Sequence, residues 1–126
     1  MKLEAGMWVR TTYGRIYKIE KVETKKVYYS CNPLELQWQD REFVYSKSGM
    51  ECETAISKAS HSLLGNDEEP CLIEVGDYVN GERVINIMKK HKYLEVSDEE
   101  IIIDEKDIKT IVTKEQFEQM QYKVVD

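Results

Sequence analysis

The chain has 126 residues, 41% apolar and 33% charged, and its formal net charge at pH 7 is −6. Its apolar content excludes a disordered chain, and no apolar run approaches the ~20 residues of a membrane-spanning helix. Net acidity also disfavours nucleic-acid binding by bulk charge, because neutralising phosphates requires a basic surface. The N-terminal residues 1–4 contain no apolar export segment, so we expect a cytoplasmic protein with no membrane contact.

One motif occurs twice in the chain. Residues 3–9 (LEAGMWV) and 73–79 (IEVGDYV) both read apolar–Glu–small–Gly–x–aromatic–Val, and a β-rich stretch follows each. This predicts two copies of one small domain, at 1–64 and 71–126, joined by an acidic linker at 65–70. Each copy is near the lower size limit for an independent core, so we expect the copies to pack on each other or on a partner, for example in a homodimer.

The first half predicts short β-strands separated by turns. Tyr13-Gly14 is a hairpin turn between strands at 8–11 and 15–22, and a break is expected at 23–26. A strand at 27–31 then ends at Asn32-Pro33, because Pro lacks an amide hydrogen. Alternating residues at 34–38 and 42–45 predict further strands. The stretch 53–64 is compatible with a last strand or with a helical turn.

The second half repeats this plan in a compressed form. Asn80-Gly81 is a strong hairpin signal, and strands are expected at 83–87, 93–96, 101–103 and 107–112. Thr113-x-x-Gln116 has the form of a capping box, which predicts a short helix over 114–120 with Phe117 and Met120 on its buried side. Residues 122–125 are expected to form a closing edge strand.

These elements predict a mainly β protein made of two tandem small β-barrel-like modules of the Src homology 3 type, with a short C-terminal helix. Closing a sheet on itself removes the exposed edges that short hairpins would otherwise leave. Trp8 and Tyr78 occupy the same place in the repeated motif, and we expect them to be equivalent core aromatic residues.

Three segments carry a resemblance to a known group of proteins. Residues 57–62 (SKASHS), 72–81 (LIEVGDYVNG) and 108–118 (IKTIVTKEQFE) resemble small proteins of phages and prophages of low-GC Gram-positive bacteria. The resemblance covers about the C-terminal two thirds, but the join at 63–71 is longer here than is usual in that group. It implies a phage-derived accessory protein acting in a bacterial cytoplasm, and it assigns no activity.

No pattern predicts catalysis, a cofactor or a metal site. His61 and His91 have no neighbouring nucleophile motif, and no glycine-rich phosphate loop is present. Cys31, Cys52 and Cys71 lack metal-ligand spacing, so we interpret them as reduced thiols rather than as ligands together with His61. Three carboxylates, Asp104, Glu105 and Asp107, would suit a divalent cation, but such runs more often form a solvated strand end.

Two kinds of binding function follow from the division of charge. Residues 1–64 have 10 basic against 8 acidic side chains, and residues 65–126 have 8 against 16. The first hypothesis is a non-enzymatic interaction protein that blocks or modulates a host protein, for example one of anti-phage defence. It would bind a basic surface through an acidic face. That face comprises Asp98, Glu99, Glu100, Asp104, Glu105 and Asp107.

The alternative is a nucleic-acid-binding module in the first half. Basic side chains there alternate with aromatic ones, which would follow a phosphate backbone and stack on bases. These residues are Arg10, Arg15, Lys18, Lys21, Lys25, Lys26, Tyr13 and Tyr17, with Tyr28 and Tyr29 nearby. A further alternative is a pocket between the modules that captures a small signalling nucleotide.

Overall fold

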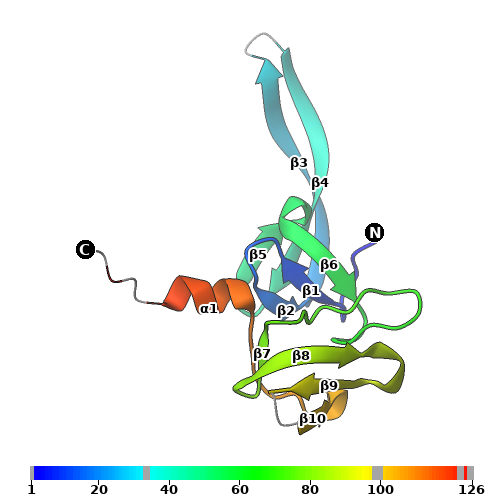
Figure 1. Ribbon diagram of the computed structural model, residues 1–126. Helices are drawn as coiled ribbons and strands as arrows, with labels where there is room; N and C mark the ends of the chain where they lie inside the picture. Colours follow the sequence, from blue (N-terminus) through cyan, green and yellow to red (C-terminus); the bar gives the residue numbers. More distant parts are fainter. Residues whose placement is uncertain (1, 33–34, 98–100, 122–123, 125–126) are drawn as a thin grey trace.

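The computed structural model describes residues 2–32, 35–97, 101–121 and 124. The protein is mainly β, with a short C-terminal helix and a curled sheet that forms half of a barrel (Figure 1). The strands of the first half are β1 (Trp8–Thr11), β2 (Ile16–Lys18), β3 (Lys21–Asn32), β4 (Glu35–Ser46), β5 (Gly49–Cys52) and β6 (Ile56–Ser60). The second half contains β7 (Tyr78–Val79), β8 (Glu82–Met88), β9 (Tyr93–Val96), β10 (Ile101–Asp104), β11 (Ile111–Val112) and the helix α1 (Lys114–Met120). No helix within the described residues is long and apolar enough to cross a membrane.

Within the described residues, the strands form three antiparallel sheets. Two lie in the first half, with strand orders β2-β1-β6 and β3-β4-β5, and the third has the order β10-β9-β8-β7-β11. The predicted strand at 15–22 is divided, since β2 ends at Lys18 and β3 begins at Lys21. The open prediction for 53–64 resolves into a 3₁₀ turn, Glu53–Ala55, followed by β6.

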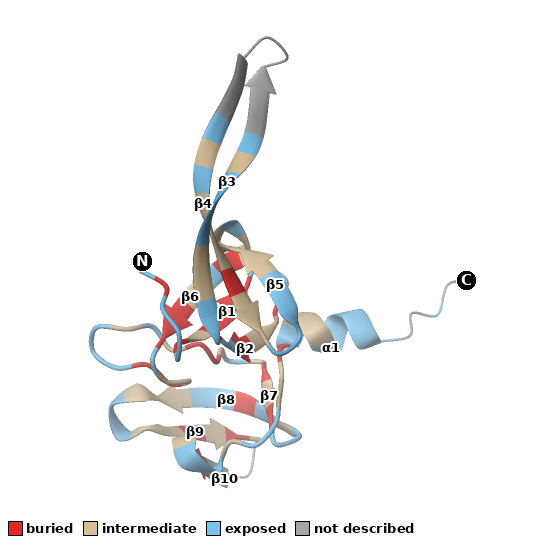
Figure 2. Ribbon diagram, turned by 180° about the vertical axis from the view of Figure 1, so that it is seen from behind, coloured by how far each residue is buried: buried red, intermediate tan, exposed pale blue. Residues whose placement is uncertain are grey.

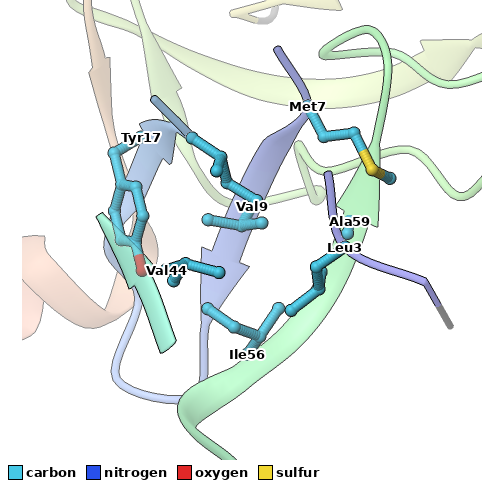
Figure 3. Close-up of a cluster of buried hydrophobic side chains, with 8 residues drawn as sticks. Leu3, Met7, Val9, Tyr17, Val44, Ile56 and Ala59 are labelled. Atoms are coloured by element: carbon cyan, nitrogen blue, oxygen red, sulfur yellow. The ribbon is translucent and has the colours of Figure 1, made fainter. Parts of the chain in front are cut away.

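Each half has its own cluster of buried apolar side chains. The first cluster lies between the two sheets of the first half (Figure 3), and it comprises Leu3, Met7, Val9, Tyr17, Ile19, Val44, Ile56 and Ala59. The second is built mainly on the five-stranded sheet and also includes Leu64, from the end of the first half; it comprises Leu64, Ile73, Val79, Val84, Leu94, Val96 and Ile103. Burial of such side chains is the dominant favourable contribution to folding.

The repeated motif has the same backbone geometry in both halves. Gly6 and Gly76 have φ angles of +92° and +100°, which side chains with a Cβ rarely adopt. Three backbone hydrogen bonds recur, with donor and acceptor at matching positions. In the first copy they are Gly6 N to Ile19 O, Ile19 N to Met7 O and Met7 N to Glu4 O; in the second they are Gly76 N to Val84 O, Val84 N to Asp77 O and Asp77 N to Glu74 O. At the position where the first copy has Met7, the second copy has a carboxylate, Asp77.

The predicted break at 23–26 is wrong, because β3 and β4 run without interruption as a long hairpin. Beyond the pairing of β4 with β5, which ends at Phe43 and Cys52, the outer parts of the two strands pair only with each other. This projecting segment, residues 24–32 and 35–42, is called the arm. It extends away from the rest of the molecule (Figure 1), and exposed residues are frequent along its described part (Figure 2). At about 3.3 Å per residue, nine residues of β3 give the arm a length of about 25–30 Å.

Two local signals in the second half are confirmed, whereas the strand expected at 107–112 is confined to β11, Ile111–Val112. Asn80-Gly81 connects β7 and β8 with positive φ angles of 52° and 81°, as a two-residue hairpin turn requires. The Thr113 hydroxyl accepts a hydrogen bond from Gln116 N at 3.2 Å, and Thr113 N donates to Gln116 Oε1 at 3.1 Å. This is the predicted capping box, and α1 spans the predicted residues 114–120.

Several expectations about burial are wrong. Trp8 and Tyr78 are only half-buried, because successive side chains of a strand point to opposite faces and their neighbours Val9 and Val79 occupy the cores.

The helix α1 also buries less than its pattern predicts. Phe117 is 37% exposed and stacks on Tyr78 at a ring distance of 4.6 Å, while Met120 is 68% exposed. In the expected edge strand at 122–125, Val124 is 83% exposed and is not part of a strand, and the other three residues lie outside the described residues.

Candidate functional site

Arg10 is the centre of the contact between the two halves. Its side chain is 1% exposed and lies against Asp77, which is completely buried. Two guanidinium nitrogens donate to the two carboxylate oxygens of Asp77 at 2.5 and 3.0 Å. A third bond reaches the carbonyl oxygen of Leu72 at 3.0 Å, and a fourth reaches Glu115 Oε2 at 2.7 Å. Such a two-pronged ion pair fixes orientation as well as distance.

Asp77 also organises the chain around itself. Its carboxylate accepts hydrogen bonds from the backbone amides of Glu74 at 2.7 Å and Lys114 at 2.9 Å, in addition to those from Arg10. The amide of Lys114 belongs to the first turn of α1, so one buried carboxylate connects β1, the repeated motif and the helix. Burial lowers the pKa of Arg10, but the hydrogen bond and charge of Asp77 outweigh this effect and raise the pKa above its ordinary value.

A second layer of charges surrounds this pair. Glu74 bonds to Lys114 at 2.7 Å and to Lys58 at 2.9 Å, and it lies 3.5 Å from Arg10 Nε. Burial raises the pKa of Glu74. The hydrogen bonds from Lys114 and Lys58 and the charge of Arg10 have the larger, opposite effect and lower this pKa to about 2. Glu74 is therefore ionised near neutral pH, and its ion pairs with Arg10 and Lys58 join the two halves.

Gly14 makes a second close contact between the halves. Its carbonyl oxygen accepts a hydrogen bond from the hydroxyl of Thr113 at 2.5 Å. A Cβ at Gly14 would lie 2.6 Å from Thr113 Oγ1 and 2.6 Å from Glu115 Cβ, which is too close for real atoms. The turn at Tyr13-Gly14 thus packs directly on the start of α1.

This contact corrects one predicted site residue. A side chain that is 1% exposed and paired with buried Asp77 is not available to a nucleic acid, so Arg10 does not belong to an exposed basic face. The sequence alone does not indicate this burial, because the partner lies 67 residues away.

The other basic and aromatic residues predicted in the first half do not form one continuous surface. Arg15 lies over the Tyr17 ring at 5.3 Å, and the Tyr17 hydroxyl donates to Glu51, although Tyr17 itself is buried. Lys18 lies 5.9 Å from the Trp8 ring. Tyr13 is 44% exposed in its turn.

Lys21 and Lys25 are brought together on one face of β3. Both lie over the Tyr45 ring, at 4.9 and 5.5 Å, with Glu23 between them. Glu23 bonds to Lys21 at 2.6 Å, lies 3.8 Å from Lys25 and accepts a hydrogen bond from the Tyr45 hydroxyl. The hydrogen bond from Lys21 lowers the pKa of Glu23, so its negative charge offsets the two lysines at neutral pH. Lys26 alternates with Lys25 along the strand and therefore lies on the opposite face, across from Asp40.

The outer part of the arm exposes an aromatic pair that sequence reasoning missed. Tyr28 and Trp38 are direct partners in the β3–β4 register, with ring centres 4.8 Å apart and planes inclined by 60°. Tyr28 is 53% exposed and Trp38 is 65% exposed. Proline and a change of pattern near the tip concealed the register, so nothing in the sequence aligned these two residues.

The predicted acidic face is described only in part. Asp98, Glu99 and Glu100 lie outside the described residues. Asp104 ends β10, and Glu105 and Asp107 lie in the 3₁₀ turn Glu105–Asp107 that follows it. Basic side chains lie beside them, because a shallow depression of about 510 Å³ is lined by His91, Lys92, Asp104, Glu105 and Lys106.

A more apolar pocket of about 430 Å³ lies beside β2. Both aromatic and lysine residues are among those that line it. The lining residues are Trp8, Tyr17, Lys18, Ile19, Glu20, Lys47 and Ser48, all from the first half.

Neither a metal centre nor a known relative identifies a chemistry for these surfaces. Within residues 2–32, 35–97, 101–121 and 124, no group of three His, Cys, Asp or Glu side chains is arranged to hold a metal ion. No family model, curated protein or solved structure matches the chain in comparisons with known proteins.

Proposed function

We propose that this chain is a non-enzymatic interaction protein of phage or prophage origin that binds a bacterial host protein and blocks or modulates it. The observation that carries this proposal is the arm with its exposed pair, Tyr28 and Trp38. Tyrosine and tryptophan are the residues most enriched at the energetic centres of protein interfaces.

The arm is a two-stranded hairpin that a bound partner would stabilise. A two-stranded hairpin is only marginally stable in water by itself, and the outer arm has no third strand among the described residues. A partner that packs on the aromatic pair would supply the missing apolar surface. The contact between the two tilted rings already orients both side chains, which lowers the entropy lost on binding.

The charge of the arm favours a protein over a nucleic acid. Residues 21–46 contain four basic and four acidic side chains, so the hairpin has no formal net charge. A phosphate backbone requires a basic surface, whereas the centre of a protein interface is typically depleted of charge. The second half, with a formal net charge of −8, would direct the arm toward a partner with a basic surface.

The proposal includes the tandem arrangement. We interpret residues 1–64 and 71–126 as two copies of one small Src homology 3-like barrel, with 65–70 as the join. The matching hydrogen bonds of the repeated motif support this interpretation. In this arrangement Arg10 and Asp77 fix the acidic half relative to the arm, so that both reach the same partner.

The test is an affinity capture from a lysate of a low-GC Gram-positive bacterium, with nuclease added and a high-salt wash. The tagged protein is compared with a double variant, Tyr28→Ser/Trp38→Ser, and with Tyr13→Ser. Tyr13 is a matched control, because it is a similarly exposed tyrosine in a turn far from the arm in sequence.

We expect the wild type and the Tyr13→Ser control to retain one host protein in equal amounts. The amount that the double variant retains should be at least about tenfold lower. Equal retention by all three proteins would contradict a role for the arm. Captured material that disappears on nuclease treatment would instead favour the alternative, nucleic-acid binding through Lys21, Lys25 and their neighbours.

A further inference from the structure

We infer that the pocket beside β2 is a binding site for a small planar anion, of the class of a nucleotide monophosphate. This site is independent of the arm. It lies within the first half, not between the two halves.

The walls of the pocket suit a flat ring. Trp8 is half-buried and therefore partly accessible, whereas Tyr17 and Ile19, which also line the pocket, are buried. Aromatic side chains of this kind stack with ring ligands, because such a contact requires only a flat face. The volume of about 430 Å³ is within the range of small-molecule sites.

Two lysines that line the pocket would attract a negatively charged group. Lys18 and Lys47 both line it, and Lys18 lies over the Trp8 ring at 5.9 Å. Among the described side chains, neither lysine has a carboxylate within 4.0 Å, unlike Lys21, Lys58 and Lys114. Two cations beside an aromatic wall provide both contacts that a ring with a phosphate group needs.

One residue that lines the pocket would disfavour an anionic ligand. Glu20 lies in the same pocket, and its carboxylate would repel a phosphate group. The same electrostatic argument therefore predicts opposite effects at two neighbouring positions. Removing the charge of Lys47 should weaken binding, and removing the charge of Glu20 should strengthen it.

The experiment titrates the full chain with adenosine 5′-monophosphate and follows the indole N–H signals by NMR. The chain has two tryptophans, so Trp38 on the arm is an internal control for Trp8 in the pocket. We expect a saturable shift of the Trp8 signal with little change at Trp38. Adenosine and inorganic phosphate, tested separately, should each bind at least about tenfold more weakly.

Three variants complete the test. At low salt, Lys47→Gln should weaken binding by about three- to tenfold, Glu20→Gln should strengthen it by a similar factor, and Lys90→Gln, an exposed lysine of the second half, should leave it unchanged. The inference is overturned if the Trp8 signal does not move, if both tryptophan signals move together, or if the Lys47 and Glu20 variants change affinity in the same direction.

Discussion

Replacing Arg10 by methionine tests the contact between the halves most sharply. Methionine keeps much of the length of the side chain but removes the charge and every guanidinium hydrogen bond. Asp77, which is completely buried, would retain its two bonds from backbone amides but lose its ion-pair partner. Breaking a buried pair in this way typically costs about 3–5 kcal/mol, out of a total stability of about 5–15 kcal/mol.

Urea unfolding, followed by circular dichroism and tryptophan fluorescence, measures this loss. Arg15→Met is the matched control, because Arg15 is 33% exposed and lies 3.5 Å from Glu51, and it should cost no more than about 1 kcal/mol. A double-mutant cycle of Arg10→Met with Asp77→Asn should give a coupling of about 1–3 kcal/mol. The reasoning is refuted if Arg10→Met costs less than about 1 kcal/mol, or if the two substitutions are simply additive.

Two further predictions concern other parts of the molecule. Gly14→Ala should destabilise the protein by at least about 1 kcal/mol more than Gly49→Ala, since both sites have positive φ angles but only Gly14 would clash with α1; equal urea midpoints would contradict this. Hydrogen bonds with Glu69 and Glu4 raise the pKa of His61, so its contribution to stability is complete below the unfolded pKa of about 6.5 and is lost as pH rises through the folded pKa. His61→Asn should therefore lower the urea midpoint at pH 5.5 more than at pH 8.5, and a pH-independent difference would exclude this ion pair.

Local features of the fold could be predicted because their signals are local. A two-residue Asn-Gly turn fixes its own dihedral angles, and the Thr113–Gln116 capping box satisfies amides within one helical turn. The repeated motif was equally visible, and its hydrogen bonds recur in both halves.

The contact between the halves was not predictable in this way, because it joins residues far apart in the sequence. One signal did exist. Arg10 stands between two residues that are buried, Val9 and Thr11, and the second copy of the motif has Asp77 where the first has Met7. A cation in one buried strand and an anion unique to one copy would together have indicated a buried pair.

The arm was missed for a different reason. The polar run at 23–26 predicts a break when the sequence is taken alone. In the arm no core is present, and alternating charges on both faces are compatible with a continuous strand. The register that joins Tyr28 to Trp38 depends on the tip of the hairpin, which the pattern alone does not define.

The central claim, that the arm binds a host protein, is tested most directly by photocrosslinking in cells. A benzophenone amino acid is placed at Trp38 and, as a control, at Tyr13. If the arm binds a host protein, we expect one discrete crosslinked host protein from position 38 and none of that size from position 13. The same products from both positions, or crosslinks at position 38 only to nucleic acid, would contradict it.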